Sequence, residues 1–225
     1  MERIAVKVCG LRRADEVAAA VAAGVAYLGF NFFPPSPRSI APAEAAALGA
    51  AVPPGVARVG LFVDPTDALL AATLAVAPLD IVQLHGAETP ARVAEVRARF
   101  GLPVMKAVGV ADAADLGAIA EHGRVADMLL VDAKPPRGAV LPGGNGLAFD
   151  WRLIAGRRWP CPWMLAGGLT PANVAEAIAR TGARQVDVAS GVESAPGVKD
   201  PARIRAFVAA ARAAGPALAP GGASC

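Results

Sequence analysis

Short apolar runs alternate with longer helical patterns from one end of the chain to the other. Each run is four to seven residues long and lacks a helical period, which is typical of a strand buried on both faces of a parallel sheet. The predicted strands span residues 4–9, 27–31, 57–63, 81–84, 104–108, 128–132, 163–166 and 185–189. The predicted helices span residues 13–23, 42–51, 66–76, 90–100, 113–121, 151–154, 171–181 and 201–214.

Residues typical of helix ends support these boundaries. Three helices are predicted to begin with a proline directly after a capping residue, at Thr89-Pro90, Thr170-Pro171 and Asp200-Pro201. Three helices, two of them the same, are followed by a glycine where a left-handed cap is favoured, at Gly24, Gly101 and Gly182.

Eight strand–helix units predict an α/β protein with a closed (β/α)8 barrel, the TIM-barrel fold, in a single domain over residues 1–214. A doubly wound open sheet is the alternative, but it usually carries a G-x-G-x-x-G sequence after its first strand. Here the first strand ends in Cys9-Gly10-Leu11, which favours the barrel.

Residues 215–225 lack periodicity and are predicted to form a flexible C-terminal tail. Residues 133–149 form a long Pro/Gly-rich loop, and loops of that length are usually functional or disordered.

Composition narrows the class of protein. The chain of 225 residues suits one barrel, and a hydrophobic content of 55% is enough for a large core. The net charge of +3 is scattered without a basic stripe, so we expect no nucleic-acid partner. Cys9, Cys161 and Cys225 lack metal-ligand spacing, which predicts no metal site and a reducing compartment. With no secretory signal and no membrane-spanning stretch, we expect a soluble cytoplasmic protein.

Reactive groups end several of the predicted strands. Because the carboxyl ends of parallel strands meet at one mouth, these groups predict an active site assembled from distant segments. Cys9 is either a small buried residue or a thiolate base, and its position, with Lys7 on the same strand face, favours the base. Asp132 is either a loop cap or a catalytic acid that a desolvated mouth keeps protonated. For Asp187, an internal ion pair and a functional role are equally supported.

Glycines after the last two strands predict a phosphate site. Gly167 and Gly168 follow the seventh strand, and Ser190 and Gly191 follow the eighth. Glycine lets backbone N–H groups approach an anion closely, and these two loops are the recurrent phosphate site of such barrels. Arg38 lies in a proline-stiffened loop and offers a fork for a carboxylate.

Two other groups carry weaker signals. His85 follows the fourth strand, and we expect a structural role because no second metal ligand lies nearby in the sequence. Gly143-Gly144-Asn145-Gly146 could form the hinge of a lid.

Eight segments in order resemble the phosphoribosylanthranilate isomerase family of tryptophan biosynthesis. They are Lys7-Val8-Cys9-Gly10-Leu11, Gly29-Phe30-Asn31-Phe32 with Ser36-Pro37-Arg38-Ser39-Ile40, Gly60-Leu61-Phe62-Val63, Gln83-Leu84-His85-Gly86, Leu130-Val131-Asp132, Gly143-Gly144-Asn145-Gly146 with Phe149-Asp150-Trp151, Leu165-Ala166-Gly167-Gly168-Leu169 and Val186-Asp187-Val188-Ala189-Ser190-Gly191-Val192-Glu193. They cover nearly the whole chain.

The resemblance implies a cofactor-independent Amadori rearrangement of a phosphosugar substrate, with Cys9 as general base and Asp132 as general acid. It further implies that Arg38 binds the anthranilate carboxylate and that Asp187 lies near the sugar and amine. Gly167, Gly168, Ser190 and Gly191 would bind phosphate, although Ala189 replaces a serine frequent in the family. We expect no membrane partner and a monomer or homodimer.

Two alternative functions remain open. One is another metal-free phosphosugar barrel, such as indole-glycerol-phosphate synthase or a phosphoribosyl-formimino isomerase. A first strand ending in Cys9 rather than a carboxylate disfavours the isomerase, and the catalytic Lys/Glu set of the synthase is missing. The other is a non-catalytic phosphate-binding barrel, which the presence of both Cys9 and Asp132 disfavours.

Overall fold

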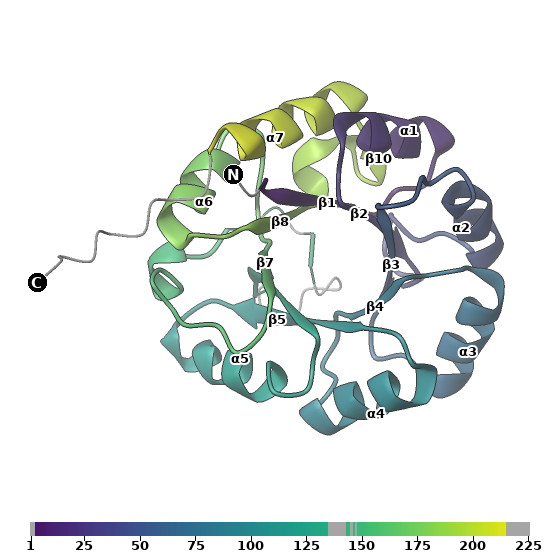
Figure 1. The fold of residues 1–225 in the computed structure, drawn as a ribbon, viewed down its shortest axis with the longest axis horizontal. Helices are drawn as coiled ribbons and strands as arrows, with labels where there is room; N and C mark the ends of the chain where they lie inside the picture. Colours follow the sequence, from purple (N-terminus) through teal and green to yellow (C-terminus); the bar gives the residue numbers. More distant parts are fainter. Residues whose placement is uncertain (1–2, 135–142, 145, 147, 215–225) are drawn as a thin grey trace, which may run out of the picture.

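Eight parallel strands close into a barrel in the computed structural model, which describes residues 3–134, 143–144, 146 and 148–214 (Figure 1). The strands are β1 (Ala5–Cys9), β2 (Tyr27–Asn31), β3 (Ala57–Phe62), β4 (Ile81–Leu84), β5 (Val104–Val110), β6 (Met128–Ala133), β7 (Trp163–Leu165) and β8 (Gln185–Val188). Each pairs with the next strand in sequence, and β8 pairs with β1 to complete the circle. The predicted barrel is confirmed, and no predicted strand end is displaced by more than two residues.

Helices surround the barrel as an outer ring (Figure 1). They are α1 (Ala14–Ala23), α2 (Pro42–Gly49), α3 (Asp67–Val76), α4 (Pro90–Phe100), α5 (Leu116–His122), α6 (Val174–Thr181) and α7 (Pro201–Ala213). Short 3₁₀ turns form at η1 (Ala113–Asp115), η2 (Trp151–Leu153) and η3 (Ser190–Val192). The chain also forms an unpredicted two-stranded hairpin, β9 (Glu193–Ala195) and β10 (Val198–Lys199). The predicted tail lies outside the described residues, as does much of the 133–149 loop.

The helix ends follow from local chemistry, with one exception. The side chains of Thr89 and Asp200 accept hydrogen bonds from backbone N–H groups at the starts of α4 and α7, as predicted. Gly24, Gly101 and Gly182 adopt the predicted left-handed conformation after α1, α4 and α6. The prediction that α6 begins at Pro171 is wrong, because it begins at Val174. The intervening turn is held by Asn173, whose side chain accepts from the Thr170 N–H and donates to the Gly168 carbonyl.

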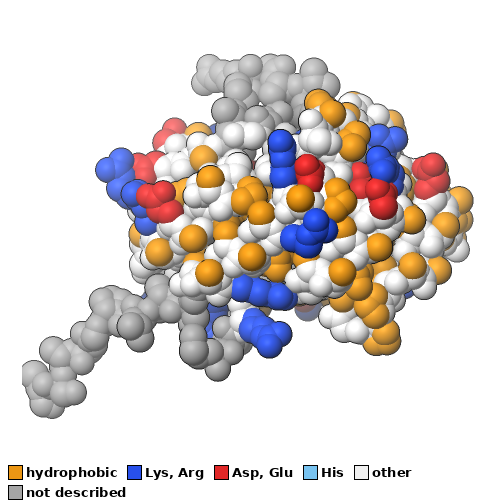
Figure 2. All heavy atoms as spheres, turned by 90° about the horizontal axis from the view of Figure 1, so that it is seen from above, with side chains coloured by type: hydrophobic (Ala, Val, Ile, Leu, Met, Phe, Trp, Pro, Cys, Tyr) orange, Lys and Arg blue, Asp and Glu red, His pale blue; other side chains and the backbone are white. Residues whose placement is uncertain are grey.

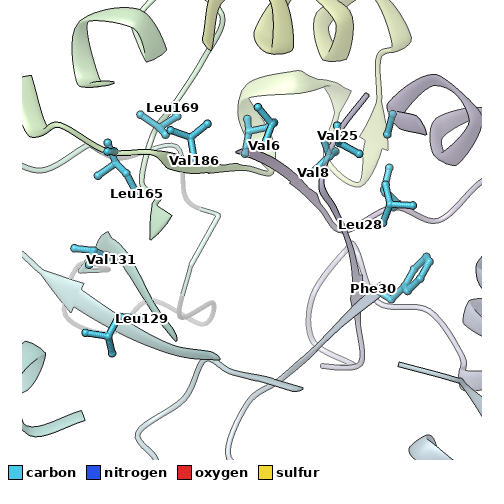
Figure 3. Close-up of a cluster of buried hydrophobic side chains, with 14 of the residues drawn as sticks. Val6, Val8, Val25, Leu28, Phe30, Leu129, Val131, Leu165, Leu169 and Val186 are labelled. Carbon is cyan, nitrogen blue, oxygen red and sulfur yellow. The ribbon is translucent and has the colours of Figure 1, made fainter. Parts of the chain in front are cut away.

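Alternation along the strands divides the interior into two layers. Val6, Val8, Leu28 and Phe30 point away from the centre of the barrel into the layer beneath the helices (Figure 3). The inward residues of β5, β6 and β7 form a separate apolar cluster of Met105, Ala107, Leu130, Met164 and Ala166. Apolar residues therefore fill both layers, and the inward positions near the strand ends are left for polar groups.

The outer surface is mixed in charge. On the side of the molecule shown in Figure 2, acidic and basic side chains are interspersed among hydrophobic and neutral groups. Several exposed charges of the described chain form ion pairs, as in Arg180–Glu176 on α6 and Arg13–Asp15 at the start of α1. Within the described part of the chain, no helix combines the length and apolar character that crossing a membrane requires.

Neighbouring leucines on α3 provide a test of this packing. Leu70 is fully buried against the barrel, whereas Leu69 is 42% exposed. We predict that Leu70→Ala lowers the free energy of unfolding by about 2–5 kcal/mol, because it leaves a cavity in the core. The matched variant Leu69→Ala should cost less than about 1 kcal/mol. Urea denaturation of both variants measures the difference, and equal losses would contradict the placement of this helix.

Candidate active site

The predicted site residues lie around the carboxyl ends of the strands, and most line two adjoining cavities. One cavity is lined by residues that include Cys9, Arg38, His85, Asp132 and Asp187. The other is lined by the loops after β6, β7 and β8, and includes Gly167, Gly168 and Ser190. Asp132, Gly144, Asp187 and Ala189 border both cavities. A ligand that filled both would therefore pass between the two aspartates.

Cys9 lies beside a buried ion pair. Lys7 is directly opposite Asp187 in the register of β1 and β8, and its Nζ donates to Asp187 Oδ1 at 2.9 Å. Burial alone lowers the pKa of Lys7, but Asp187 and Cys9 outweigh it and raise the pKa above its ordinary value. An ammonium group beside a thiol favours the thiolate. Gly29 on β2 leaves space for the Cys9 thiol, because a Cβ at position 29 would lie 2.9 Å from the Cys9 Sγ.

Asp132 contacts a histidine for which the sequence predicted only a structural role. The His85 Nε2 lies 3.3 Å from Asp132 Oδ2, and both side chains are about one-tenth exposed. Gln83 presents its amide Nε2 to His85 Nδ1 at 2.8 Å. Which of these two nitrogens donates depends on the tautomer of the imidazole. Gly143 covers the pair, since a Cβ there would lie 2.7 Å from each of the two facing atoms.

Arg38 is buried, with 6% of its surface exposed, and does not lie on a solvated loop. The Ser36 hydroxyl accepts from the Arg38 N–H and from the Asn31 side chain, which shapes the loop after β2. The guanidinium donates through Nε and Nη2 to the two carboxylate oxygens of Glu193, at 2.7 and 2.9 Å. This partner at the start of the β9–β10 hairpin was not predicted from the sequence.

The predicted phosphate end is built from turns. Gly167 and Gly168 both have positive φ, 87° and 60°, which brings the backbone after β7 to the cavity wall. Ser190 lies at the start of η3 and lines the same cavity. Gly191 lies outside the cavity lining, and a Cβ there would collide with the Leu169 carbonyl, so the two loops touch. Asn145 of the proposed hinge lies outside the described residues.

The sequence predicted only a structural role for His85 and did not single out Glu193 or Lys199, although all three lie near the site. The Lys199 Nζ donates to Glu193 Oε1 at 2.7 Å and to the Ala189 carbonyl at 2.9 Å. A histidine directly after a strand could have been placed at the mouth, as Cys9 was. By contrast, the contacts of Glu193 depend on a hairpin too short to leave a pattern. No cluster of three or more His, Cys, Asp or Glu side chains suited to a metal occurs among the described residues.

A closed barrel with polar groups gathered at the carboxyl ends of its strands defines a (β/α)8-barrel enzyme. Comparison with known proteins narrows this class. A profile of the N-(5'phosphoribosyl)anthranilate (PRA) isomerase family matches residues 6–210. The chain belongs to this family, which decides against the alternative phosphosugar barrels considered above.

Individual relatives agree with this membership. An N-(5'-phosphoribosyl)anthranilate isomerase from Paracoccus denitrificans is 69% identical over 210 residues, covering 93% of this chain and 98% of the relative. The crystal structure of phosphoribosyl anthranilate isomerase from Thermotoga maritima superimposes with a TM-score of 0.84 at 34% identity, covering 93% and 99% of the two chains. A phosphoribosyl anthranilate isomerase in complex with reduced 1-(o-carboxyphenylamino)-1-deoxyribulose 5-phosphate gives a TM-score of 0.81 at 33% identity, with the same coverage.

The charge beside Cys9 can be tested directly. We predict that Lys7→Met slows alkylation of Cys9 by iodoacetamide at pH 7 about tenfold or more, because the neighbouring ammonium no longer favours the thiolate. Mass spectrometry of the Cys9 peptide measures the rate without interference from Cys161 and Cys225. Lys106→Met serves as control, since Lys106 is a buried lysine paired with Glu88 rather than with a residue beside Cys9. A wild-type rate in Lys7→Met would contradict the assigned electrostatic role.

Proposed function

We propose that this chain catalyses the isomerisation of N-(5-phosphoribosyl)anthranilate to 1-(2-carboxyphenylamino)-1-deoxyribulose 5-phosphate in tryptophan biosynthesis. The observation that carries the proposal is the placement of a thiol, a carboxyl group and an arginine, from Cys9, Asp132 and Arg38, around one cavity. An aldose-to-ketose shift needs one acid and one base near the same sugar. Family membership supports the identity of the substrate.

The reaction begins with the acid. Asp132 protonates the ring oxygen of the ribose, the bond from C1′ to that oxygen breaks, and the nitrogen lone pair forms the iminium. His85 is placed to contact the carboxylate that remains, because its Nε2 lies 3.3 Å from Asp132 Oδ2.

The base completes the rearrangement. The Cys9 thiolate removes the proton from C2′, and the released electron pair neutralises the iminium to give the enolamine. The Asp132 carboxylate then takes the proton of the 2′-hydroxyl while the Cys9 thiol returns a proton to C1′, which produces the ketone and restores the starting forms of acid and base. Lys7 balances the thiolate charge throughout, because it lies on the same face of β1.

The two cavities suit the two ends of the substrate. The anthranilate carboxylate would lie toward Arg38, in the cavity that also holds Cys9. The phosphate would lie toward the N–H groups of the Gly167-Gly168 and Ser190-Gly191 turns. The ribose would then pass between Asp132 and Asp187, which border both cavities. Ala189 also borders both, and it lacks the hydroxyl donor that a serine would add.

The catalytic pair gives the sharpest test. We predict that Cys9→Ser and Asp132→Asn each reduce kcat about 100-fold or more, because the first lacks a thiolate and the second cannot donate a proton. The loss in the double variant should be smaller than the product of the single losses, since both residues serve one proton-transfer sequence. The fluorescence change on substrate consumption measures kcat. Cys161→Ser is the control for loss of a thiol and should retain wild-type turnover. A near wild-type kcat in Cys9→Ser or in Asp132→Asn would show that the substituted residue has no part in the mechanism.

The phosphate site is tested at Gly168. We predict that Gly168→Val raises KM about tenfold or more, because the side chain obstructs backbone approach to the phosphate. Gly182→Val matches the conformational strain, since Gly182 has φ 71° after α6 and a Cβ there would meet no described atom within 4 Å. The control should lose stability with little change in KM. An equal rise in KM for both variants would show that strain alone accounts for the effect.

A further inference from the structure

Three buried charges form a cluster behind the carboxylate end of the cavity. Arg38 and Lys199 both donate to Glu193, and all three residues are less than one-tenth exposed. Glu193 accepts both guanidinium bonds in a fork, and its Oε1 is shared between Arg38 Nε and Lys199 Nζ. Neither Glu193 nor Lys199 lines the cavity itself. The cluster therefore touches the cavity through Arg38 alone.

We propose that Glu193 is a positioning residue that orients Arg38 for the substrate carboxylate, and so determines the preference of this site for an acidic aromatic group. This inference rests on the proposed function. It assigns no proton transfer and no substrate contact to Glu193, because the guanidinium lies between Glu193 and the cavity.

The hydrogen-bond geometry supports this role. The fork occupies Nε and one side of Nη2, and Nη2 also donates to the Gly144 carbonyl at 3.4 Å, which leaves Nη1 for another partner. Nη1 faces the loop after β6, since a Cβ on Gly144 would lie 2.7 Å from it, and Gly144 borders the cavity. An unrestrained arginine has many rotamers, whereas a bidentate carboxylate fixes the plane of the guanidinium. A substrate carboxylate then meets donors that are already oriented.

The charge balance of the cluster also fits one anion. Two cations surround one carboxylate, so the three groups carry a single unbalanced positive charge. Although burial raises the pKa of Glu193, its bonds to Arg38 and Lys199 outweigh this and lower the pKa, which keeps the carboxylate ionised. Burial lowers the pKa of Lys199, and the facing Glu193 opposes that effect. A bound carboxylate would complete two ion pairs in a buried environment.

The backbone around Glu193 is anchored on several sides. Lys199 ties the hairpin to the end of β8 through the Ala189 carbonyl, and its own N–H donates to Glu16 of α1 at 2.8 Å. The Arg203 guanidinium of α7 donates to the Glu193 carbonyl. The hairpin that presents Glu193 is therefore fixed to three elements, which is what precise orientation of Arg38 requires.

Glu193→Gln tests the proposal through the sign of its effect. Removal of a negative charge near an anion site would, by charge alone, tighten substrate binding. If Glu193 acts by orienting Arg38, KM should instead rise about tenfold or more, with a smaller change in kcat. Glu193→Asp keeps the charge but shortens the side chain by one methylene, so it should also raise KM. A lower KM in Glu193→Gln, or wild-type KM in Glu193→Asp, would overturn the proposal.

A matched control exists at the opposite end of the barrel. Arg58 donates to Asp80 through the same two nitrogens, Nε and Nη2, each at 2.8 Å, close to the starts of β3 and β4. Asp80→Asn breaks the same kind of fork, and we expect wild-type KM. Thermal unfolding of all variants separates a general loss of stability from an effect on binding. A rise in KM for Asp80→Asn equal to that for Glu193→Gln would show that the effect is structural.

A double-mutant cycle with Arg38 completes the test. If Glu193 acts only through Arg38, Glu193→Gln should leave KM unchanged in an Arg38→Ala background. A further rise there would overturn the positioning role. Turnover of the substrate by the wild-type chain is measured first: its absence would overturn the proposed function and this inference together, whereas turnover with a failed cycle would overturn the inference alone.

Discussion

Closure of the barrel between its first and last strands is the constraint on which the site depends. Parallel strands expose alternate residues to the interior, so a register shift of one residue would move every inward group to the outer face. The β1–β8 register sets Lys7 against Asp187 and leaves Cys9 two residues further along the inward face. The ion pair contributes little net stability once the desolvation of both charges is counted. Its value lies in requiring a single register, since any other leaves two buried charges without partners.

The interior of the barrel changes character along its axis. Met105, Leu130 and Met164 fill the interior with apolar atoms nearer the amino-terminal ends of the strands. Asp132, Asp187 and Cys9 occupy inward positions nearer the carboxyl ends. The apolar layer keeps the polar groups out of bulk water, which strengthens each electrostatic interaction among them. Both residues of the ion pair, together with Asp132 and His85, therefore interact in an environment shielded from bulk water.

The local pattern of apolar runs and helical segments was enough to predict the barrel and most of the residues at its mouth. Strand ends place residues at the mouth whatever their partners, which is why the position of Cys9, Asp132 and Gly168 at the mouth could be predicted from the sequence. Contacts between distant segments could not be read in this way. The Arg38–Glu193 fork joins residues 155 positions apart, through a hairpin whose strands have only three and two residues. At α6 the Thr-Pro signal was misleading because Asn173, rather than Thr170, organises the turn.

The ion pair that closes the barrel links residues 180 positions apart in the chain. A ribosome makes the amino-terminal strand first, so Lys7 emerges long before Asp187 exists to neutralise it. Contacts of such sequence separation also carry a large loop-closure entropy and form late in folding. A nascent chain that stops short of β8 has neither a closed barrel nor the turn after β8 that lines the cavity, even though Cys9 has already been synthesised. In this architecture the complete site can therefore form only near the end of translation.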